Sequence, residues 1–358
     1  MIYYLLVKIP EAQIYFINFE NPEYFHLNTF DQLYLYLKEH YPTNQRTYFL
    51  FDKIQKVTQW QKLINGLRVA YDYDIYITGS NASLLSGELA TYLTGRYVEI
   101  QMHPLSFQEF LTFKNEPQLQ PAHLLNEYLQ FGGFPSVVLQ KDDALKKDVL
   151  NGIYRILLRD VALRATVKEP ELLSRIATYL LDNIGQLIST NKIANTLRLN
   201  GRKVSNNTVE NYLQLLEDSF LFYKVTRFDI RGKERLKNQR KYYTVDLGFI
   251  ISQLHQIHSN RVSKIENLVF LELRKQGYQV YVGKYDSKEI DFVATKAEET
   301  IYIQVTEQLP TDSQRETENL LHLPTGHKKM IITNSWMDVG TYEGIAIVHL
   351  QDFLLGEG

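Results

Sequence analysis

The feature that most constrains the fold is the segment TYFLFDKIQKV at residues 47–57, an apolar run that leads directly into Asp52. A run without polar alternation is typical of a parallel strand covered on both faces. Ligands collect at the carboxyl ends of such strands. The segment therefore predicts the central strand of an α/β sheet, with Asp52 at the ligand-binding edge.

Two further strand patterns, at residues 13–20 and 73–80, lie on either side of this run, and helical patterns separate the three. Alternating strands and helices predict a parallel sheet. The pattern then becomes helical from about residue 121 to 219. This change predicts the first domain boundary near residue 115.

Composition places the chain among ordinary globular proteins. Its 358 residues are 44% hydrophobic and 22% charged, enough apolar material for two or three domains. No window approaches the roughly 18 apolar residues of a membrane span. We therefore expect a cytoplasmic protein without a membrane partner. The absence of cysteine excludes thiolate metal sites, cysteine nucleophiles and disulfides.

Residues 170–250 have the pattern of a winged helix. An apolar stripe at helical spacing is followed by a short helical segment at 191–199. Asn207 and Glu210 have the spacing of a capping box that opens a third helix. Two alternating strands then flank a basic stretch. In this geometry a recognition helix enters the major groove of DNA while the wing contacts phosphates.

Positive charge is concentrated in the same segment. Residues 192–241 hold twelve Lys or Arg against five Asp or Glu, a net +7, so the rest of the chain carries −9 of the overall −2. The densest part, residues 231–241, predicts contact with nucleic-acid phosphates. A solvated basic hairpin and a winged helix that binds only protein are the alternatives. The candidate nucleic-acid contacts are Arg202, Lys203, Asn206, Asn207, Arg231, Lys233, Arg235 and Lys237.

A series of segments in chain order resembles one family. The segments include INFENPEYF, FLFDKIQKV, IYITGSNASLLS, LTGRYVEI, HPLSFQEF, YLQFGGFP, LLRDV, KYYTVDLG, IENLVFLELRKQGY and EIDFV. The chain resembles the prokaryotic AAA-type ATPases that end in a restriction-endonuclease-like domain of unknown function. The resemblance implies an α/β fold class with an ATPase core at 1–115, a helical lid or linker at 116–169, a winged helix at 170–250 and a restriction-endonuclease-like domain at 251–358.

Members of that family start with a P-loop, G-x-x-x-x-G-K-[ST], and this chain contains no such motif. The resemblance implies ATP and Mg²⁺ as cofactors, with Asp52 on the metal, Ser80 and Asn81 near the γ-phosphate and Arg96 serving a neighbouring site. Lys53 stands where the family has glutamate, and a cation there cannot polarise the attacking water.

We therefore expect a truncated, degenerate ATP site that holds neither cofactor efficiently. Two explanations of the chain's start stay open. The reading frame has lost its 5′ portion, or the chain begins at an internal methionine of a longer protein.

A second constellation lies near the C-terminus. Glu266 on a helix, Asp291 in EIDFV and Gln304 in IQVT match the layout of restriction-endonuclease-like nucleases. That chemistry needs oxygen ligands for Mg²⁺ and a lysine. Thr306 occupies the lysine position and Gln304 offers only a neutral oxygen, so we expect at most a weak metal site at Glu266 and Asp291. Lys296 is the candidate for a lysine that has migrated.

The leading hypothesis is a degenerate ATPase-family protein that binds DNA or a partner protein without efficient ATP hydrolysis and without acting as an enzyme. One alternative is an enzyme of DNA metabolism or phage defence whose C-terminal domain cuts DNA. Another is a scaffold that assembles with complete homologues, or with further copies of itself.

Overall fold

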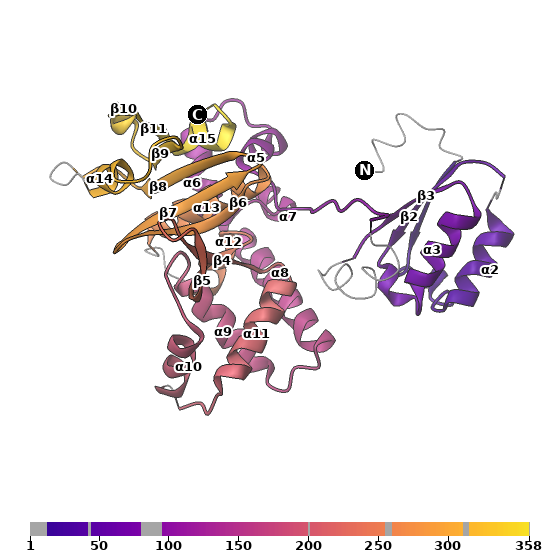
Figure 1. Cartoon of the computed structure of the whole chain (residues 1–358). Helices are drawn as coiled ribbons and strands as arrows, with labels where there is room; N and C mark the ends of the chain where they lie inside the picture. The colour runs from indigo at the N-terminus through magenta and orange to yellow at the C-terminus, as the bar shows by residue number, and fades with distance from the viewer. Residues whose placement is uncertain are drawn as a thin grey trace. The chain divides into compact units, whose positions relative to one another are not determined.

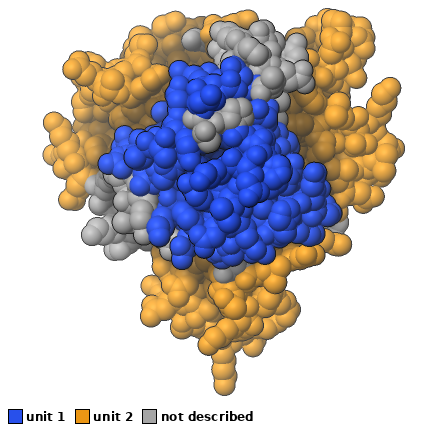
Figure 2. All heavy atoms as spheres, turned by 90° about the vertical axis from the view of Figure 1, so that its right-hand side faces the viewer, with its two compact units in different colours: residues 1–101 blue, residues 102–358 orange. Residues whose placement is uncertain are grey.

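The computed structural model describes residues 13–41, 44–79, 95–199, 201–254, 260–310 and 315–357. The chain divides into two compact units, residues 1–101 and 102–358, which Figure 2 colours separately. Figure 1 labels their helices and strands. No helix in the described ranges is long and apolar enough to cross a membrane.

The first unit contains a parallel sheet in the order β1-β2-β3. Strand β2 is central, as the apolar run before Asp52 predicts, and its Phe49 and Phe51 are fully buried. They join one hydrophobic cluster with residues of the two helices, among them Leu33 and Leu63. The elements are β1 (Ile14–Asn18), η2 (Pro22–Tyr24), α2 (Phe30–His40), β2 (Thr47–Asp52), η3 (Ile54–Lys56), α3 (Trp60–Ala70) and β3 (Tyr73–Ile77).

The second unit is built on a mixed sheet in the order β10-β11-β9-β8-β7-β6-β4-β5. Strands β8, β9 and β11 run parallel, whereas β6, β7 and β8 form an antiparallel meander. The strands are β4 (Phe222–Asp229), β5 (Glu234–Thr244), β6 (Gln279–Tyr285), β7 (Lys288–Lys296), β8 (Glu299–Thr306), β9 (Lys328–Thr333), β10 (Gly340–Tyr342) and β11 (Ile345–His349).

The hairpin β4–β5 extends this sheet, because β4 pairs with β6 in parallel. Three helices precede the hairpin in the order expected of residues 170–250. The helices of the unit are α5 (Phe107–Lys114), α6 (Pro121–Phe131), α7 (Pro135–Val138), α8 (Asp143–Arg164), α9 (Pro170–Asp182), α10 (Thr190–Leu199), α11 (Asn206–Asp218), α12 (Gly248–Leu254), α13 (Arg261–Lys275), α14 (Arg315–Leu321), η5 (Trp336–Asp338) and α15 (Leu350–Leu355).

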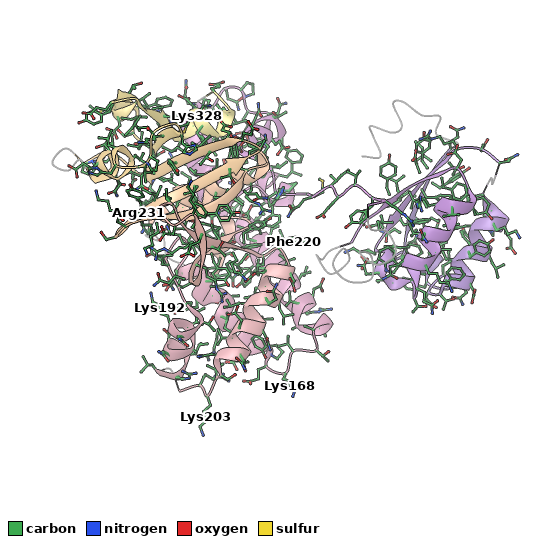
Figure 3. The ribbon with its side chains drawn as sticks, viewed as in Figure 1. Lys168, Lys192, Lys203, Phe220, Arg231 and Lys328 are labelled. Carbon is green, nitrogen blue, oxygen red and sulfur yellow. The ribbon has the colours of Figure 1, made fainter. Side chains whose placement is uncertain are left out.

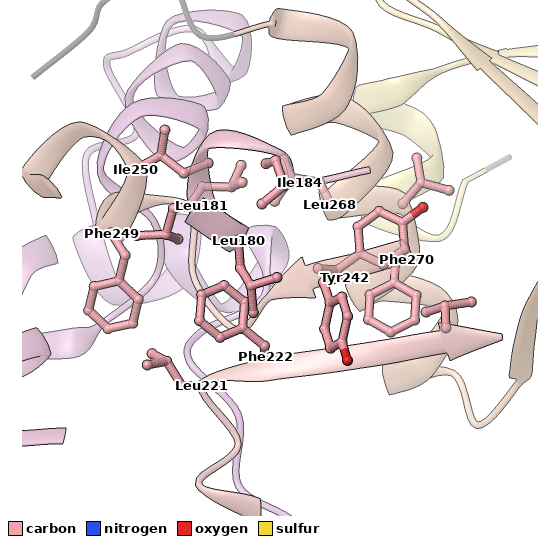
Figure 4. Packing of buried hydrophobic residues seen from close by; sticks show 14 of the residues in the cluster. Leu180, Leu181, Ile184, Leu221, Phe222, Tyr242, Phe249, Ile250, Leu268 and Phe270 are labelled. Carbon is pink, nitrogen blue, oxygen red and sulfur yellow. The ribbon is translucent and has the colours of Figure 1, made fainter. Parts of the chain in front are cut away.

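The division between the units lies after Gln101, not near residue 115 as the change of pattern led us to expect. Helix α5 packs on α6, α7 and α15, and its Phe107 and Phe110 belong to the core of the second unit. That core takes buried residues from elements between α5 and α15, and a second cluster around Ile290 and Ile331 lies in the C-terminal strands. Figure 4 shows buried side chains of α9, β4, β5, α12 and α13 within the larger cluster. The segments expected as domains at 116–169, 170–250 and 251–358 each contribute residues to the larger of these clusters.

Three of the motifs quoted above meet at the buried carboxylate of Asp246. It accepts the backbone N–H of Gly133 at 2.7 Å and that of Gly248 at 2.8 Å. Leu105 in turn donates its N–H to the carbonyl of Gly133. A Cβ at Gly132, where φ is +73°, would lie 1.8 Å from the Asp246 carboxylate, so only glycine fits there. The segments HPLSFQEF, YLQFGGFP and KYYTVDLG thus form a structural junction.

This junction predicts a pH dependence of stability. Burial raises the pKa of Asp246 to about 7, although N–H donors from Gly133, Gly248 and Phe134 oppose the shift. The pKa of an aspartate in the unfolded chain is about 4. At a pH between this value and the pKa of the folded chain, Asp246 is protonated in the folded chain and ionised in the unfolded chain. The free energy of unfolding should fall by up to about 1.4 kcal/mol per pH unit between these two values.

The measurement is urea unfolding of the wild type and of Asp246→Asn across pH 4 to 8. The asparagine cannot titrate, so the stability advantage of the wild type should be largest near pH 4 and smallest above pH 7. A constant difference between the two proteins across this range would show that Asp246 stays ionised in the folded chain.

Candidate functional site

At the edge of the small sheet, Asp52 is held by the protein itself. Thr78, just beyond β3, donates its hydroxyl to Asp52 Oδ1. The backbone N–H of Lys53 donates to the Thr78 hydroxyl oxygen at 3.4 Å. Lys53 has a φ of 60°, so the chain turns sharply just after the carboxylate. Asp52 therefore lies at the carboxyl end of β2, where the sequence predicts it.

The other predicted residues of the ATP site are less informative. Ser80 and Asn81 lie outside the described residues. Arg96 is exposed in the segment that precedes the second unit. Their roles in ATP binding stay predictions.

The second unit brings Glu266, Asp291 and Gln304 together. Glu266 projects from α13, Asp291 from β7 and Gln304 from the neighbouring strand β8. Gln304 Oε1 accepts the backbone N–H of Asp291 at 2.7 Å, and Asp291 Oδ2 accepts the N–H of Val305 at 2.8 Å. Together with Glu289 of β7, these residues form what we call the carboxylate cluster.

A lysine that sequence reasoning did not single out fills the centre of the carboxylate cluster. Lys241 of β5 has a side chain only 3% exposed. Its Nζ lies 2.7 Å from Glu266 Oε1 and 2.9 Å from Glu289 Oε1. Asp291 Oδ1 lies 3.8 Å from the same nitrogen. An ammonium group therefore occupies the space between the carboxylates.

The residues that the sequence offered in place of the nuclease lysine do not lie between the carboxylates. Lys296 donates to the carbonyl of Gln276 at 2.7 Å, and Thr306 donates its hydroxyl to the carbonyl of Gln308. Gln304 donates its amide to Glu316 of α14 at 2.7 Å. Lys296, the candidate for a lysine that has migrated, is thus bonded elsewhere, and the cation comes from Lys241 of β5.

The electrostatics of the carboxylate cluster follow from burial. Burial, reinforced by Glu266, raises the pKa of Asp291 to about 8, although Lys241 and the N–H of Val305 oppose the shift. Burial alone would lower the pKa of Lys241, but Glu266, Asp291 and Glu289 outweigh it and raise this pKa well above its ordinary value. Lys241 is thus a permanent positive charge. No group of three or more His, Asp or Glu side chains in the described ranges is arranged to hold a metal ion.

Strand β5 carries this cation because its side chains alternate between two faces. Lys241 and Tyr243 both contact Glu266 of α13. Arg240 contacts Glu210 of α11, and Tyr242 donates its hydroxyl to Glu217 of the same helix at 2.9 Å. The segment RKYYT thus binds α11 on one side and the carboxylate cluster on the other. Two residues of the apparently basic stretch are therefore internal.

The amino-terminal ends of α10 and α11 lie side by side. Asn206, the first residue of α11, donates its amide to Asn191 of α10. Ser205 caps α11 by accepting the N–H of Thr208, so the predicted capping box of Asn207 and Glu210 is wrong by two positions. Glu210 is engaged by Arg240 instead, which lowers its pKa to about 2.

The predicted nucleic-acid contacts near this end differ in their surroundings. Asn206, Asn207 and Lys203 are exposed, and Figure 3 shows Lys203 pointing away from the helices. Arg202 forms an ion pair with Glu171 at 2.7 Å. Lys203 is therefore more accessible to a ligand than Arg202.

The predicted contacts on the hairpin differ in the same way. Lys233 is exposed at the turn between β4 and β5. Arg231 forms an ion pair with Asp286 at 2.8 Å. The side chains of Arg235 and Lys237 lie outside the described residues.

Comparison with known proteins supports the N-terminal assignment. Residues 1–111 match an AAA domain, and residues 122–260 match a domain of unknown function (DUF8612). An uncharacterized protein of Haemophilus influenzae is 46% identical over 351 residues, which cover 97% of this chain and 87% of that protein. The chain belongs to an AAA-type ATPase family. This family also includes the uncharacterized protein MJ1544 of Methanocaldococcus jannaschii, 33% identical over 316 residues, which cover 84% of this chain and 70% of that protein.

One solved structure is distantly similar to this AAA-type ATPase-family chain. The Walker-type ATPase PABY2304 of Pyrococcus abyssi matches 68% of this chain and 85% of its own, with 13% identity and a TM-score of 0.44. A likeness of this size says nothing about activity.

Lys241 gives a test of the carboxylate cluster. Lys241→Met should lower the free energy of unfolding by about 3–5 kcal/mol, because removal of one partner leaves buried carboxylates without a counter-charge. Lys233→Met, in the exposed turn of the same hairpin, is the control and should cause no measurable change. Urea unfolding monitored by circular dichroism measures both. Equal stability of the two variants would contradict the buried pairing.

Proposed function

We propose that this AAA-type ATPase-family protein is a DNA-binding module that acts without efficient ATP hydrolysis and without metal-dependent cutting of DNA. The observation that carries the proposal is the surface of α11. Glu210 and Glu217 are paired with basic residues, Asp218 accepts the amide of Gln214, and the exposed face presents the uncharged side chains of Asn207 and Asn211. The helix with its neighbours α9 and α10 and the hairpin β4–β5 would act as a winged helix.

The charges of α11 support an approach to phosphate. Glu210 is paired with Arg240, and Glu217 is paired with Lys224 at 3.0 Å. These pairs reduce the repulsion that the helix would exert on a polyanion. Asn207, Asn211 and Gln214 are exposed at positions i, i+4 and i+7 of one helix face, and Gln214 donates its amide to Asp218 at 2.9 Å.

Two exposed lysines flank the amino-terminal ends of α10 and α11 along the chain. Lys192 and Lys203 are exposed at the paired ends of α10 and α11, and Figure 3 labels both on this lobe. The amino-terminal ends of helices carry partial positive charge and attract phosphates. Lysines and helix ends would hold the backbone, while asparagine and glutamine side chains can form paired hydrogen bonds with adenine in the major groove.

The carboxylate cluster supports the second part of the proposal. Metal-dependent cutting needs a divalent cation between the carboxylates. Lys241 Nζ already lies between Glu266 and Asp291, so a divalent cation would have to displace a buried ammonium group. The residues of a restriction-endonuclease-like site would then serve stability instead of catalysis.

The first unit supports the proposal that hydrolysis is inefficient. The Asp52 carboxylate is already bonded to the Thr78 hydroxyl, and the next residue is Lys53. A lysine cannot act as the base that activates water for attack on a phosphate. This edge of the sheet would therefore contribute little to the binding of ATP and Mg²⁺ or to hydrolysis.

The test is fluorescence anisotropy with a labelled duplex of mixed sequence, repeated over a range of salt concentrations. The wild type should bind with an affinity that falls steeply with salt, because phosphate contacts release counterions. Lys192→Glu with Lys203→Glu should weaken binding and reduce the salt slope by about 1 for each lysine that no longer binds a phosphate. Lys328→Glu is the matched control, since Lys328 is exposed at the start of β9 and paired with Glu299.

A second set of variants separates base contacts from phosphate contacts. Asn207→Ala and Asn211→Ala should reduce the preference between duplexes while the salt slope stays that of the wild type. Absence of binding at low salt would contradict the proposal. A partner protein would then be the ligand of the α11 face.

A further inference from the structure

Arg198, in the last turn of α10, is a cation that no motif of the sequence singled out. Its Nε donates to the carbonyl of Val204 at 3.0 Å, and its Nη1 donates to Oδ1 of Asn195 at 2.9 Å. Its Nη2 donates to Oδ1 of Asn206, the first residue of α11, at 3.1 Å. One side chain therefore joins the end of α10 to the beginning of α11.

The backbone fixes the base from which this side chain extends. Gly201 donates its N–H to the carbonyl of Arg198 at 3.0 Å, and Arg202 donates its N–H to the carbonyl of Leu197 at 3.1 Å. Gly201 has a φ of 81°, the left-handed conformation that commonly ends a helix and that glycine adopts most easily. Because these bonds close the end of α10, Arg198 spans the turn from a fixed position.

The three acceptors of Arg198 are all uncharged. One is a backbone carbonyl, and two are asparagine amides. Among the described residues, no carboxylate forms an ion pair with this guanidinium, and the residue is exposed. Arg202, four positions later, instead pairs with Glu171. Arg198 therefore keeps a full positive charge at the surface, whereas the charge of Arg202 is compensated.

The hydrogen bonds of Arg198 leave part of its guanidinium for a ligand. A guanidinium has five N–H donors, so three bonds leave one donor on each terminal nitrogen. Neither of these meets an acceptor within the part of the chain that the structure describes. Arginine donors bind phosphate oxygens, often as a pair. Because the group is already held in one orientation, little conformational freedom would be lost on binding.

We propose that Arg198 binds a phosphate of the DNA backbone with its two remaining donors while it fixes the angle between α10 and α11. This inference rests on the proposed DNA binding and adds a residue to it. Lys192 lies on the same helix, and Lys203 lies in the turn that Arg198 spans. Figure 3 labels both lysines on this lobe. Three cations of α10 and the following turn would then contact the DNA backbone.

The first test is the anisotropy titration of this whole chain with a labelled duplex at several salt concentrations. Arg198→Gln should lower the affinity at low salt at least about tenfold and reduce the salt slope by about 1, because one phosphate contact is lost. Arg198→Lys should keep the slope, since the charge stays, and should lose less affinity. Arg261→Gln is the control, because Arg261 is paired with Glu307 at 3.1 Å, and should bind like the wild type.

A second variant separates phosphate binding from the positioning of the helices. Asn195→Asp keeps an acceptor for Nη1 of Arg198 but adds a carboxylate that neutralises the guanidinium. The free energy of unfolding in urea should match or exceed that of the wild type, whereas the DNA affinity and the salt slope should fall toward those of Arg198→Gln. In the Arg198→Gln background, Asn195→Asp should leave the slope unchanged, since the charge that it neutralises is gone.

The outcomes distinguish this inference from the proposed function. If the wild type does not bind the duplex at low salt, the proposed function fails and the inference fails with it. If the wild type binds and a folded Arg198→Gln variant keeps the wild-type salt slope, only the inference is overturned. Should Arg198→Gln fail to fold, Asn195→Asp decides, because a stable variant with the wild-type slope would show that Arg198 only holds the helices together.

Discussion

The structure of the second unit depends on the buried ammonium group of Lys241. Its contacts join β5 to α13 and β7, three elements that are separated along the chain. Buried charges are tolerated only when they are paired and hydrogen-bonded. Tyr243 adds a second bond to Glu266, so the pairing fixes how the hairpin β4–β5 meets the rest of the sheet. Any change that moves β5 must also break these contacts.

The same strand connects the carboxylate cluster to the proposed DNA-binding face. Arg240 and Tyr242 hold the carboxylates of α11, while Lys241 and Tyr243 hold Glu266. These alternating contacts explain why helices α9 to α11 and the C-terminal strands share one core instead of forming separate domains. They also pair Glu210 and Glu217 of α11 with the hairpin, which reduces the negative charge that the helix presents around Asn207 and Asn211.

Much of the fold could be predicted from local pattern, but the centre of the site could not. The apolar run before Asp52 identified the central strand because a doubly covered strand leaves a signal that depends on its own residues alone. The spacing of Asp291 and Gln304 likewise placed two side chains on adjacent strands. The role of Lys241 was not predicted because this residue lies fifty positions before Asp291 and belongs to a basic stretch that resembles a solvated one. The boundary near residue 115 failed because α5 belongs to the unit whose core it fills, and a change of pattern does not show tertiary packing.

The central claim is that an internal lysine holds the position between the carboxylates that a catalytic metal would need. The most direct measurement is anomalous X-ray scattering from crystals of this chain soaked in Mn²⁺. We expect Lys241 Nζ between Glu266 and Asp291 and no anomalous peak at that place. A manganese peak bound by Glu266 and Asp291, with the lysine displaced, would contradict it.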